Sequence, residues 1–250
     1  MKLAIIAPID NLNLTEKGDI DMVLAHFVEQ DYKEYISFYT QSAKFKILDN
    51  GACEGEMQGI EKVIKTACQI NASEIVLPDV IFDKDATLKQ MYNAIQWLKD
   101  NNFIARFRVM AVPQGNTKEE WWQCFEEMHN NEDVNTIGIS KLSSPHCFNK
   151  DITAARLEIT LQIKPKEDKQ YHLLGGSCNV LREIVSHPKW VRSIDTSAPI
   201  EYGKKRIRLD EAKDIEFKAE LKRGVELDDH CIVNENINLI IKSREESNAS

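Results

Sequence analysis

Acidic and amide side chains recur where strand-like segments of this chain end. Asp49 closes "FKILD", Asp79 follows "EIVLP", Gln114 follows "VMAVP", and Asp195 closes "VRSID". An acid at the exit of a strand is held by a rigid element and is open to a ligand, which suits chemistry. Each of these residues taken singly also suits a turn or a helix cap. Three acids and one amide at equivalent positions favour a shared site.

Strand-like and helix-like segments alternate along the chain. The strand-like segments are 3–7, 45–51, 74–79, 105–115, 136–140, 171–176 and 191–195, with an extra one over 35–39. Apolar residues at helical spacing predict helices within 20–28, 60–67, 88–98, 121–128 and 180–185. Residues 152–163 fit either type, because their apolar residues alternate toward the end while "AAR" favours a helix.

The alternation predicts a parallel sheet covered by helices. No Gly-x-Gly-x-x-Gly and no P-loop string follows the first strand, so a closed (β/α)8 barrel is favoured over an open doubly wound sheet. In such a barrel the C-terminal ends of the strands converge on one rim. We expect a single barrel domain over residues 1–243, completed by a helical piece at 209–243, and a disordered tail over 244–250.

Composition is that of a soluble globular protein, with 42% hydrophobic and 29% charged residues in 250. No apolar run approaches the roughly 20 residues that span a membrane. The cysteines are scattered without paired spacing, at positions 53, 68, 124, 147, 178 and 231. Scattered cysteines predict a reduced cytoplasmic protein, in the host cytoplasm if the chain is viral.

The charge balance points in two directions. The net charge of −8 argues weakly against nucleic acid as a partner. The segment 182–208 nevertheless holds seven basic and three acidic residues. Its end is the most basic part, with Lys204, Lys205, Arg206 and Arg208. This run is either a solvated charged face or a surface that contacts nucleic-acid phosphates.

An ordered set of motifs resembles the tRNA-guanine transglycosylase family. The set is Asp-x-Gly after an early strand, Asp after the next, Gln-Gly after "MAVP", Gly in "TIGIS", then "YHLLGG" and Asp in "SIDTSAP". It runs from about Ile47 to Gly203 and is most similar to the short viral and bacterial branch that inserts 7-deazaguanines into DNA. The resemblance implies a (β/α)8 barrel that exchanges guanine for a free 7-deazaguanine base without ATP or a redox cofactor.

The resemblance also implies a role for each matching residue. Asp195 would be the nucleophile that attacks the sugar C1′, and Asp49 the general acid and base. The purine would be held by Asp79, Gln114 with Gly115, Gly138, and the wall formed by Leu174 and Gly175. Displacing a base from C1′ passes through an oxocarbenium-like state that a carboxylate can trap, and two acids in one pocket have different pKa values. Polar groups can read the Watson–Crick edge of a base taken out of the stack.

Two features depart from the family. An aromatic stacking residue commonly follows the Asp-x-Gly turn, where this chain has Cys53. The tRNA enzymes carry a structural zinc site, whereas the C-terminal region here offers only His230 and Cys231 beside Asp228 and Asp229. Closed zinc sites need four ligands, so we expect no cofactor, and zinc only if scattered residues converge: His146, Cys147, His172 and Cys178. The short chain, with no appended RNA-binding domain, favours DNA over tRNA.

Several functions remain open at this level. The leading hypothesis is exchange of guanine for a deazaguanine in DNA, with tRNA as the alternative substrate and partner proteins of the modification pathway. A second is a non-catalytic family member that binds nucleic acid or a catalytic partner, against which the retention of Asp49 and Asp195 argues. A third is an unrelated barrel enzyme acting on a small phosphorylated substrate, which would have no affinity for nucleic acid.

Overall fold

Eight strands in the described part of the chain form one parallel sheet and alternate with helices. The computed structural model describes residues 1–250 except 52–58, 213–219, 222–223, 227–228 and 250. The strands are β1 (Lys2–Ile5), β2 (Asp21–Leu24), β3 (Lys46–Asp49), β4 (Glu74–Val76), β5 (Arg108–Ala111), β6 (Thr136–Ser140), β7 (Gln170–Gly176) and β8 (Ser193–Thr196). The fold is a single-domain (β/α)8 barrel, as the alternating sequence pattern predicts.

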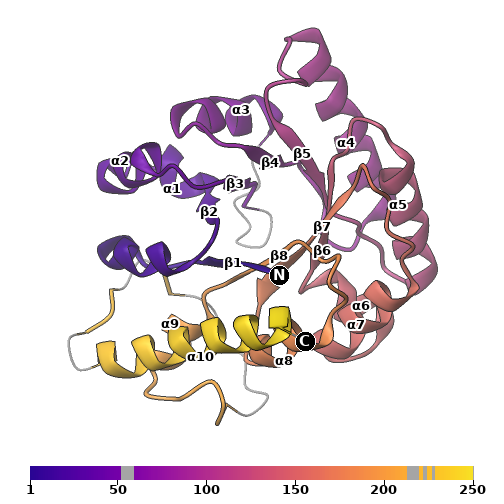
Figure 1. The fold of residues 1–250 in the computed structure, drawn as a ribbon. Helices are drawn as coiled ribbons and strands as arrows, with labels where there is room; N and C mark the ends of the chain where they lie inside the picture. Colours follow the sequence, from indigo (N-terminus) through magenta and orange to yellow (C-terminus); the bar gives the residue numbers. More distant parts are fainter. Residues whose placement is uncertain (52–58, 213–219, 222–223, 227–228, 250) are drawn as a thin grey trace.

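The sheet curls into a nearly closed ring with helices outside it (Figure 1). The strand order is β1-β8-β7-β6-β5-β4-β3-β2, and each neighbouring pair is parallel. In register, Ala4 stands beside Asp195 and Leu24 beside Asp49. Between β1 and β2 the connection is looser, because the N–H groups of Asp19 and Ile20, just before β2, both donate to the Leu3 carbonyl. All strands therefore present their C-terminal ends on one rim.

The helices pack an apolar stripe against the outside of the sheet. They are η1 (Ile9–Lys17), α1 (Ala25–Glu29), α2 (Lys33–Gln41), α3 (Ile60–Gln69), α4 (Lys84–Asp100), α5 (Lys118–Asn130), α6 (Ser143–Phe148), α7 (Ile152–Gln162), α8 (Val180–Ser186), α9 (Ala198–Gly203) and α10 (His230–Ala249). Side chains cap three of them at the start, because Asp83, Thr117 and Asp151 each accept a backbone N–H of the first turn. No described helix is both long and apolar enough to cross a membrane.

Inside the barrel, an apolar layer and a polar layer fill the space. The apolar cluster is Ala4, Ile20, Met22, Ile47, Val76, Met110 and Val112. Nearer the N-terminal ends of the strands, the Arg192 guanidinium donates to both carboxylate oxygens of Glu74, at 2.7 and 2.8 Å. The Thr136 hydroxyl donates to the same carboxylate at 2.9 Å. This end of the barrel is closed by a charged cross-link, which fits the stabilising role of that rim in barrel enzymes.

Two segments near the N-terminus differ from the sequence prediction. Residues 20–28, predicted as one helix, are the strand β2 followed by the short helix α1. All four residues of β2 are buried, so it carries apolar side chains on both faces and imitates a helical stripe. The extra strand predicted over 35–39 is instead part of α2, whose Tyr35 and Tyr39 are buried one helical turn apart. The ambiguous stretch 152–163 is helical as α7.

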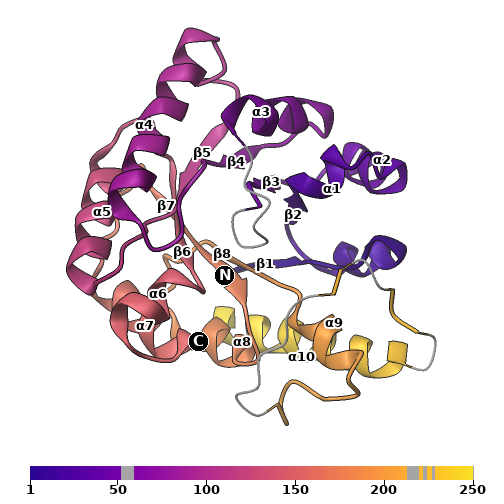
Figure 2. The ribbon, with the colours of Figure 1, turned by 180° about the vertical axis from the view of Figure 1, so that it is seen from behind.

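The C-terminal helix α10 packs along α8 and α9 (Figure 2). It runs to Ala249, which corrects the disordered tail predicted over 244–250, apart from residue 250, which lies outside the described residues. Two contacts hold the last turns: Arg244 pairs with Asp19 at 2.6 Å, and the Ser247 hydroxyl donates to the Ile184 carbonyl at 3.2 Å. The polar composition of this end suggested fraying, but the tertiary contacts extend the helix.

Candidate active site

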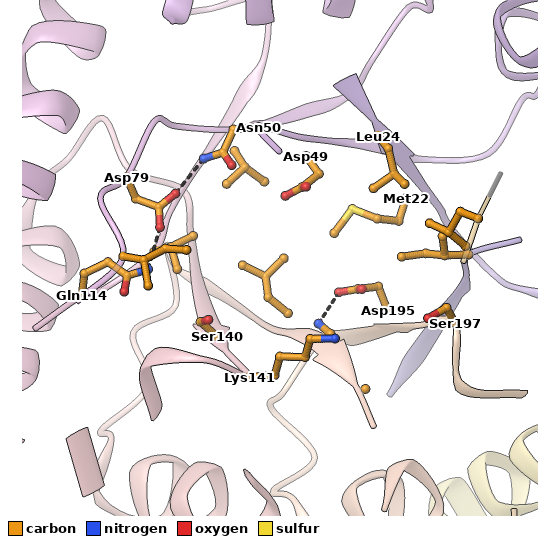
Figure 3. Close-up of a pocket in the computed structure, with 18 residues that line it drawn as sticks. Met22, Leu24, Asp49, Asn50, Asp79, Gln114, Ser140, Lys141, Asp195 and Ser197 are labelled. Carbon is orange, nitrogen blue, oxygen red and sulfur yellow. Dashed lines mark hydrogen bonds between the residues drawn. The ribbon is translucent and has the colours of Figure 1, made fainter. Parts of the chain in front are cut away.

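A cavity opens at the C-terminal ends of the strands and gathers most of the predicted site residues (Figure 3). Its volume is about 80 Å³, several times the roughly 10–15 Å³ that one water molecule needs. Six of the predicted residues line it: Asp49, Asp79, Gln114, Leu174, Gly175 and Asp195. They come from β3, β7 and β8 and from the segments that follow β4 and β5. The convergence on one rim predicted from the strand ends is confirmed as a position for Asp49, Asp79, Gln114, Gly175 and Asp195, and Leu174, which the resemblance implied, lies there too.

Asp195, in β8, is held rigidly at the base of the cavity. Its side chain is 6% exposed, and Oδ1 accepts two hydrogen bonds, from the Gly175 N–H at 2.8 Å and from His172 Nε2 at 3.0 Å. Burial acts to raise the pKa of Asp195, but the hydrogen bond from His172, the Gly175 N–H and the charge of Lys141 outweigh it and lower the pKa. The carboxylate is therefore ionised at neutral pH, and neither of these bonds engages Oδ2.

A chain of hydrogen bonds fixes the tautomer of His172. Arg192 Nε can only donate, so the Ser193 hydroxyl accepts from it at 3.0 Å and turns its own proton toward His172 Nδ1, 2.7 Å away. The opposite ring nitrogen then carries the hydrogen that Asp195 accepts. Burial lowers the pKa of His172, which keeps the ring neutral and agrees with this arrangement. His172 positions the Asp195 carboxylate from below rather than facing the cavity itself.

Asp79 lies on another wall, between two amide side chains. Asn50 Nδ2 donates to Oδ1 at 2.7 Å, and Gln114 Nε2 donates to Oδ2 at 2.6 Å. The amide oxygen of Gln114 accepts the Phe82 N–H at 3.2 Å, which fixes the orientation of that amide. Burial raises the pKa of Asp79 to about 6, and the two amide donors only partly oppose it. Asp79 can therefore change protonation close to neutral pH while its position stays fixed.

Asp49 ends β3 and lies across the cavity from Asp195 (Figure 3). Its Oδ2 accepts the Gly51 N–H at 3.2 Å. Gly51 has φ +77°, a left-handed conformation that favours glycine, so the Asp-x-Gly spacing follows from the turn. Cys53, which replaces the expected aromatic residue, lies outside the described residues. The Asp49 and Asp195 carboxylates therefore face the cavity from opposite sides.

Gly115 and Gly138, predicted in the same pocket, do not line the cavity in the structure. A side chain at Gly138 would place its Cβ 2.6 Å from Leu174 Cδ1, so this glycine leaves room for a residue that does line it. At Gly115 a Cβ would lie 2.7 Å from the backbone nitrogen of Trp121, so the first turn of α5 packs closely against the loop that contains Gly115. Both glycines thus support the cavity through packing.

Sequence reasoning placed Asn50 at this rim only as part of Asp49-Asn50-Gly51, considered His172 only as a zinc ligand, and did not name Lys141. Asn50 and Lys141 line the cavity, and His172 lies behind it. A signal existed for His172, since it is the polar residue of "YHLL" and the strand alternation puts it on the face of Leu174. Asn50 adjoins Asp49 in the same motif. Lys141 follows β6 with nothing in its sequence neighbourhood that marks it.

The basic segment at 204–208 carries paired rather than free charges. Lys204 pairs with Glu201 at 3.2 Å, and Arg206 with Asp229 at 2.9 Å. Arg208 pairs with Asp210 at 2.9 Å and with Glu235 at 2.8 Å. Phosphate contacts by this segment stay a prediction, and at these residues such contacts would compete with the existing ion pairs.

No group of three or more metal-ligating side chains comes together among the described residues. Cys147 and Cys178 are buried free thiols, and Cys231 is exposed. His172, one of the residues that might have converged on a zinc ion, instead bonds Ser193 and Asp195. Asp228 lies outside the described residues.

Compared with known proteins, the chain matches no family model and no curated protein. The class is therefore defined by the fold and the site alone, as a (β/α)8 barrel whose cavity, mostly apolar with three acidic side chains, lies at the rim where barrel enzymes carry their active sites.

Proposed function

We propose that the protein is a base-exchange transglycosylase that replaces guanine in DNA with a 7-deazaguanine through a covalent aspartyl–sugar intermediate. The observation that carries the proposal is the Asp195 carboxylate, held ionised by two hydrogen bonds at a cavity whose opposite wall bears Asp49. A nucleophile and a separate proton carrier on opposite sides of a bound group are what exchange at a sugar carbon requires.

In the first half of the reaction, a lone pair of Asp195 forms a bond to C1′ of the target deoxynucleotide. Oδ2 is the oxygen that attacks, because Oδ1 already accepts from His172 and Gly175. The bond from C1′ to the purine nitrogen breaks, and its electron pair leaves with the base. Asp49, in its protonated form, gives a proton to the departing guanine. The sugar is then held as an ester of Asp195.

The second half reverses these steps with a different base. Asp49, now ionised, removes the ring N–H proton of the incoming 7-deazaguanine, whose nitrogen attacks C1′. The ester bond breaks and its electron pair returns to Asp195. No oxidant, ATP or metal ion is needed for the balance of either half. While a base occupies the cavity it excludes water from C1′ of the ester, so water does not compete with the incoming base.

Asp79 and Gln114 support recognition of the purine. The carboxylate of Asp79 retains lone pairs after accepting from the two amides, and the N–H groups of guanine's Watson–Crick edge are suitable donors. A cavity at a barrel rim can receive this edge only from a base taken out of the stack. Exchange on tRNA would use the same residues, so tRNA is the alternative substrate.

The test is base incorporation with labelled guanine or deazaguanine, using DNA and tRNA as parallel substrates. Wild-type protein should incorporate the label into DNA, and withholding the incoming base should leave a protein–DNA adduct on a denaturing gel. Asp195→Asn should abolish both, whereas Asp49→Asn should slow exchange by about 10²–10⁴-fold. Asp85→Asn, at an exposed carboxylate of α4, is the matched control and should exchange at the wild-type rate.

Each outcome has one meaning. Exchange by Asp195→Asn near the wild-type rate would remove the nucleophile and refute the covalent mechanism. Incorporation into tRNA alone would replace the substrate and keep the mechanism. Absence of incorporation into either nucleic acid by wild-type protein would refute the transglycosylase proposal.

A further inference from the structure

A second, smaller cavity adjoins the one just described. It shares Lys141, Gly176 and Ser197 with the first cavity and is completed on its far side by residues that include Ser177 and Glu201. Its volume is about 20 Å³, above the roughly 10–15 Å³ of a single water. The space suits one small polar group attached to a larger ligand in the first cavity.

Lys141 stands on the wall between the two cavities, where its charge acts on Asp195 without a direct ion pair among the described residues. Its backbone N–H donates to the Leu174 carbonyl at 3.0 Å. Its stem lies across Gly175, where a Cβ would come within 2.6 Å of Lys141 Cδ, and φ of +76° further restricts that position to glycine. Within the described residues the Lys141 ammonium has no ion pair and no hydrogen-bond acceptor. Figure 3 shows Lys141 and Ser197 on either side of Asp195.

Two hydroxyl groups in the same place lack partners. Ser177 is a buried residue with 9% of its surface exposed, and its buried Oγ has no hydrogen-bond partner among the described residues. Ser197 also makes no side-chain hydrogen bond within the described residues. A buried hydroxyl without a partner is costly, so a ligand oxygen that accepts from it would stabilise the site.

The one carboxylate on this wall is already neutralised. Glu201 is buried and pairs with Lys204 at 3.2 Å. The small cavity therefore presents one free ammonium and two free hydroxyls to whatever enters it. Several convergent donors and one positive charge match an anion with several acceptor oxygens, and lysine is a common ligand of phosphate.

We propose that Lys141, Ser177 and Ser197 form a phosphate subsite joined to the base cavity. The inference rests on the proposed function in one respect: the phosphate would belong to the nucleotide whose sugar lies at Asp195. The ligand chemistry is a phosphate ester of a purine nucleoside. It could be supplied by a DNA backbone or by a free nucleotide, and the experiment separates the two sources.

The first arm compares binding of guanosine and 5′-guanosine monophosphate by calorimetry. Wild-type protein should prefer the monophosphate. In Lys141→Met the ratio of monophosphate affinity to guanosine affinity should fall about tenfold or more, because the substitution removes a charged hydrogen bond to the phosphate alone. Ser177→Ala should lose about threefold to tenfold. Lys89→Met, at an exposed lysine on α4, is the control and should bind both ligands as the wild type does.

The second arm measures binding of a guanine-containing single-stranded DNA as salt increases. If the DNA backbone occupies the subsite, Lys141→Met should reduce the slope of log affinity against log salt by about 0.7, the value for one phosphate contact on a single strand. A phosphate preference with free nucleotide and an unchanged slope with DNA would assign the subsite to a free nucleotide.

The subsite is refuted if wild-type protein shows no preference for the monophosphate, or if Lys141→Met weakens guanosine and its monophosphate equally. Failure of base exchange is a separate result. Wild-type protein that prefers the monophosphate through Lys141 yet incorporates no base would keep the subsite and refute the transglycosylase. Wild-type protein that incorporates base but shows no Lys141-dependent preference for the monophosphate would keep the transglycosylase and refute the subsite.

Discussion

Replacing His172 with leucine tests whether the hydrogen bond to Asp195 keeps that carboxylate ionised. The imidazole is fully buried, and its Nε2 lies 3.0 Å from Asp195 Oδ1. Leucine is close in volume and cannot donate, so the variant removes the donor with little change in packing. His172→Gln is the matched variant, because its amide nitrogen can reach the same carboxylate oxygen.

The expected size of the effect follows from the energy of that bond. A hydrogen bond to a charged group contributes about 1.5–3 kcal/mol, and one pKa unit corresponds to about 1.36 kcal/mol. Removing the bond should therefore raise the pKa of Asp195 by about 1–2 units. Burial then acts on the carboxylate with less opposition, since only the Gly175 N–H and the Lys141 charge still favour the ionised form.

The assay is the rate of base exchange as a function of pH. The nucleophile must be ionised, so activity falls as pH drops through the pKa of Asp195. In His172→Leu this acid limb should move up by about 1–2 pH units, whereas His172→Gln should stay near the wild type. The same bond stabilises the folded state above the unfolded pKa of about 3.9, and that contribution is lost as pH falls through the lowered pKa. An acid limb that does not move in His172→Leu would refute the positioning role.

Three further perturbations test other parts of the structure. Asp79→Ala should raise the KM for the incoming base by about tenfold, because an unmatched buried group costs about 1–3 kcal/mol. The wild-type KM should also rise as pH falls below about 6, the pKa of the Asp79 carboxyl. The KM of the variant should not change with pH over this range. Gly138→Ala should lower the free energy of unfolding in urea by about 1–3 kcal/mol, because its Cβ would lie 2.6 Å from a leucine methyl, whereas Gly59→Ala, with nothing within 4 Å, should change it little. Glu74→Gln should lower the free energy of unfolding at neutral pH by about 3–5 kcal/mol, because it leaves Arg192 without its charged buried partner. Burial acts to raise the pKa of Glu74, but the Arg192 hydrogen bonds lower it overall. The difference in stability from wild type should therefore shrink as pH falls below the ordinary pKa range of a glutamate. If Glu74→Gln and wild type had equal free energies of unfolding at pH 7, the buried ion pair with Arg192 would be contradicted. A Gly138→Ala variant as stable as wild type would contradict the close packing against Leu174.

The order of elements could be read from the amino acids because strand and helix periods are local. The apolar run of β6 and the helical stripe of α3 have the expected residue types, and each lies where the structure has it. Parallel strands joined by helices have few stable arrangements, so the alternation favours a barrel over an open doubly wound sheet, and the structure has the barrel. The same logic puts Asp49, Asp79, Gln114 and Asp195 at one rim.

Local patterns gave the wrong element where burial on two sides removed the periodicity. The strand β2 is buried on both faces, so its side chains match a helical stripe as well as a strand. In α2, aromatic residues typical of strands are placed by helical spacing against the core. The last turns of α10 are polar, and the ion pair of Arg244 with Asp19 joins residues too distant in sequence for any local rule to connect.

The sequence by itself determined the alternation of strands and helices and the strand-end position of Asp49, Asp79, Gln114 and Asp195, because both follow from local periodicity and from the direction of parallel strands. Only the tertiary structure decided how those residues act. It joined Asp195 to His172 and Gly175 by hydrogen bonds and enclosed Asp79 between two amides. It also left the Lys141 ammonium without an ion pair among the described residues and paired the basic run near 204–208 with acids. Protonation and free charge depend on burial and on neighbours brought from distant parts of the chain, and a linear pattern contains neither.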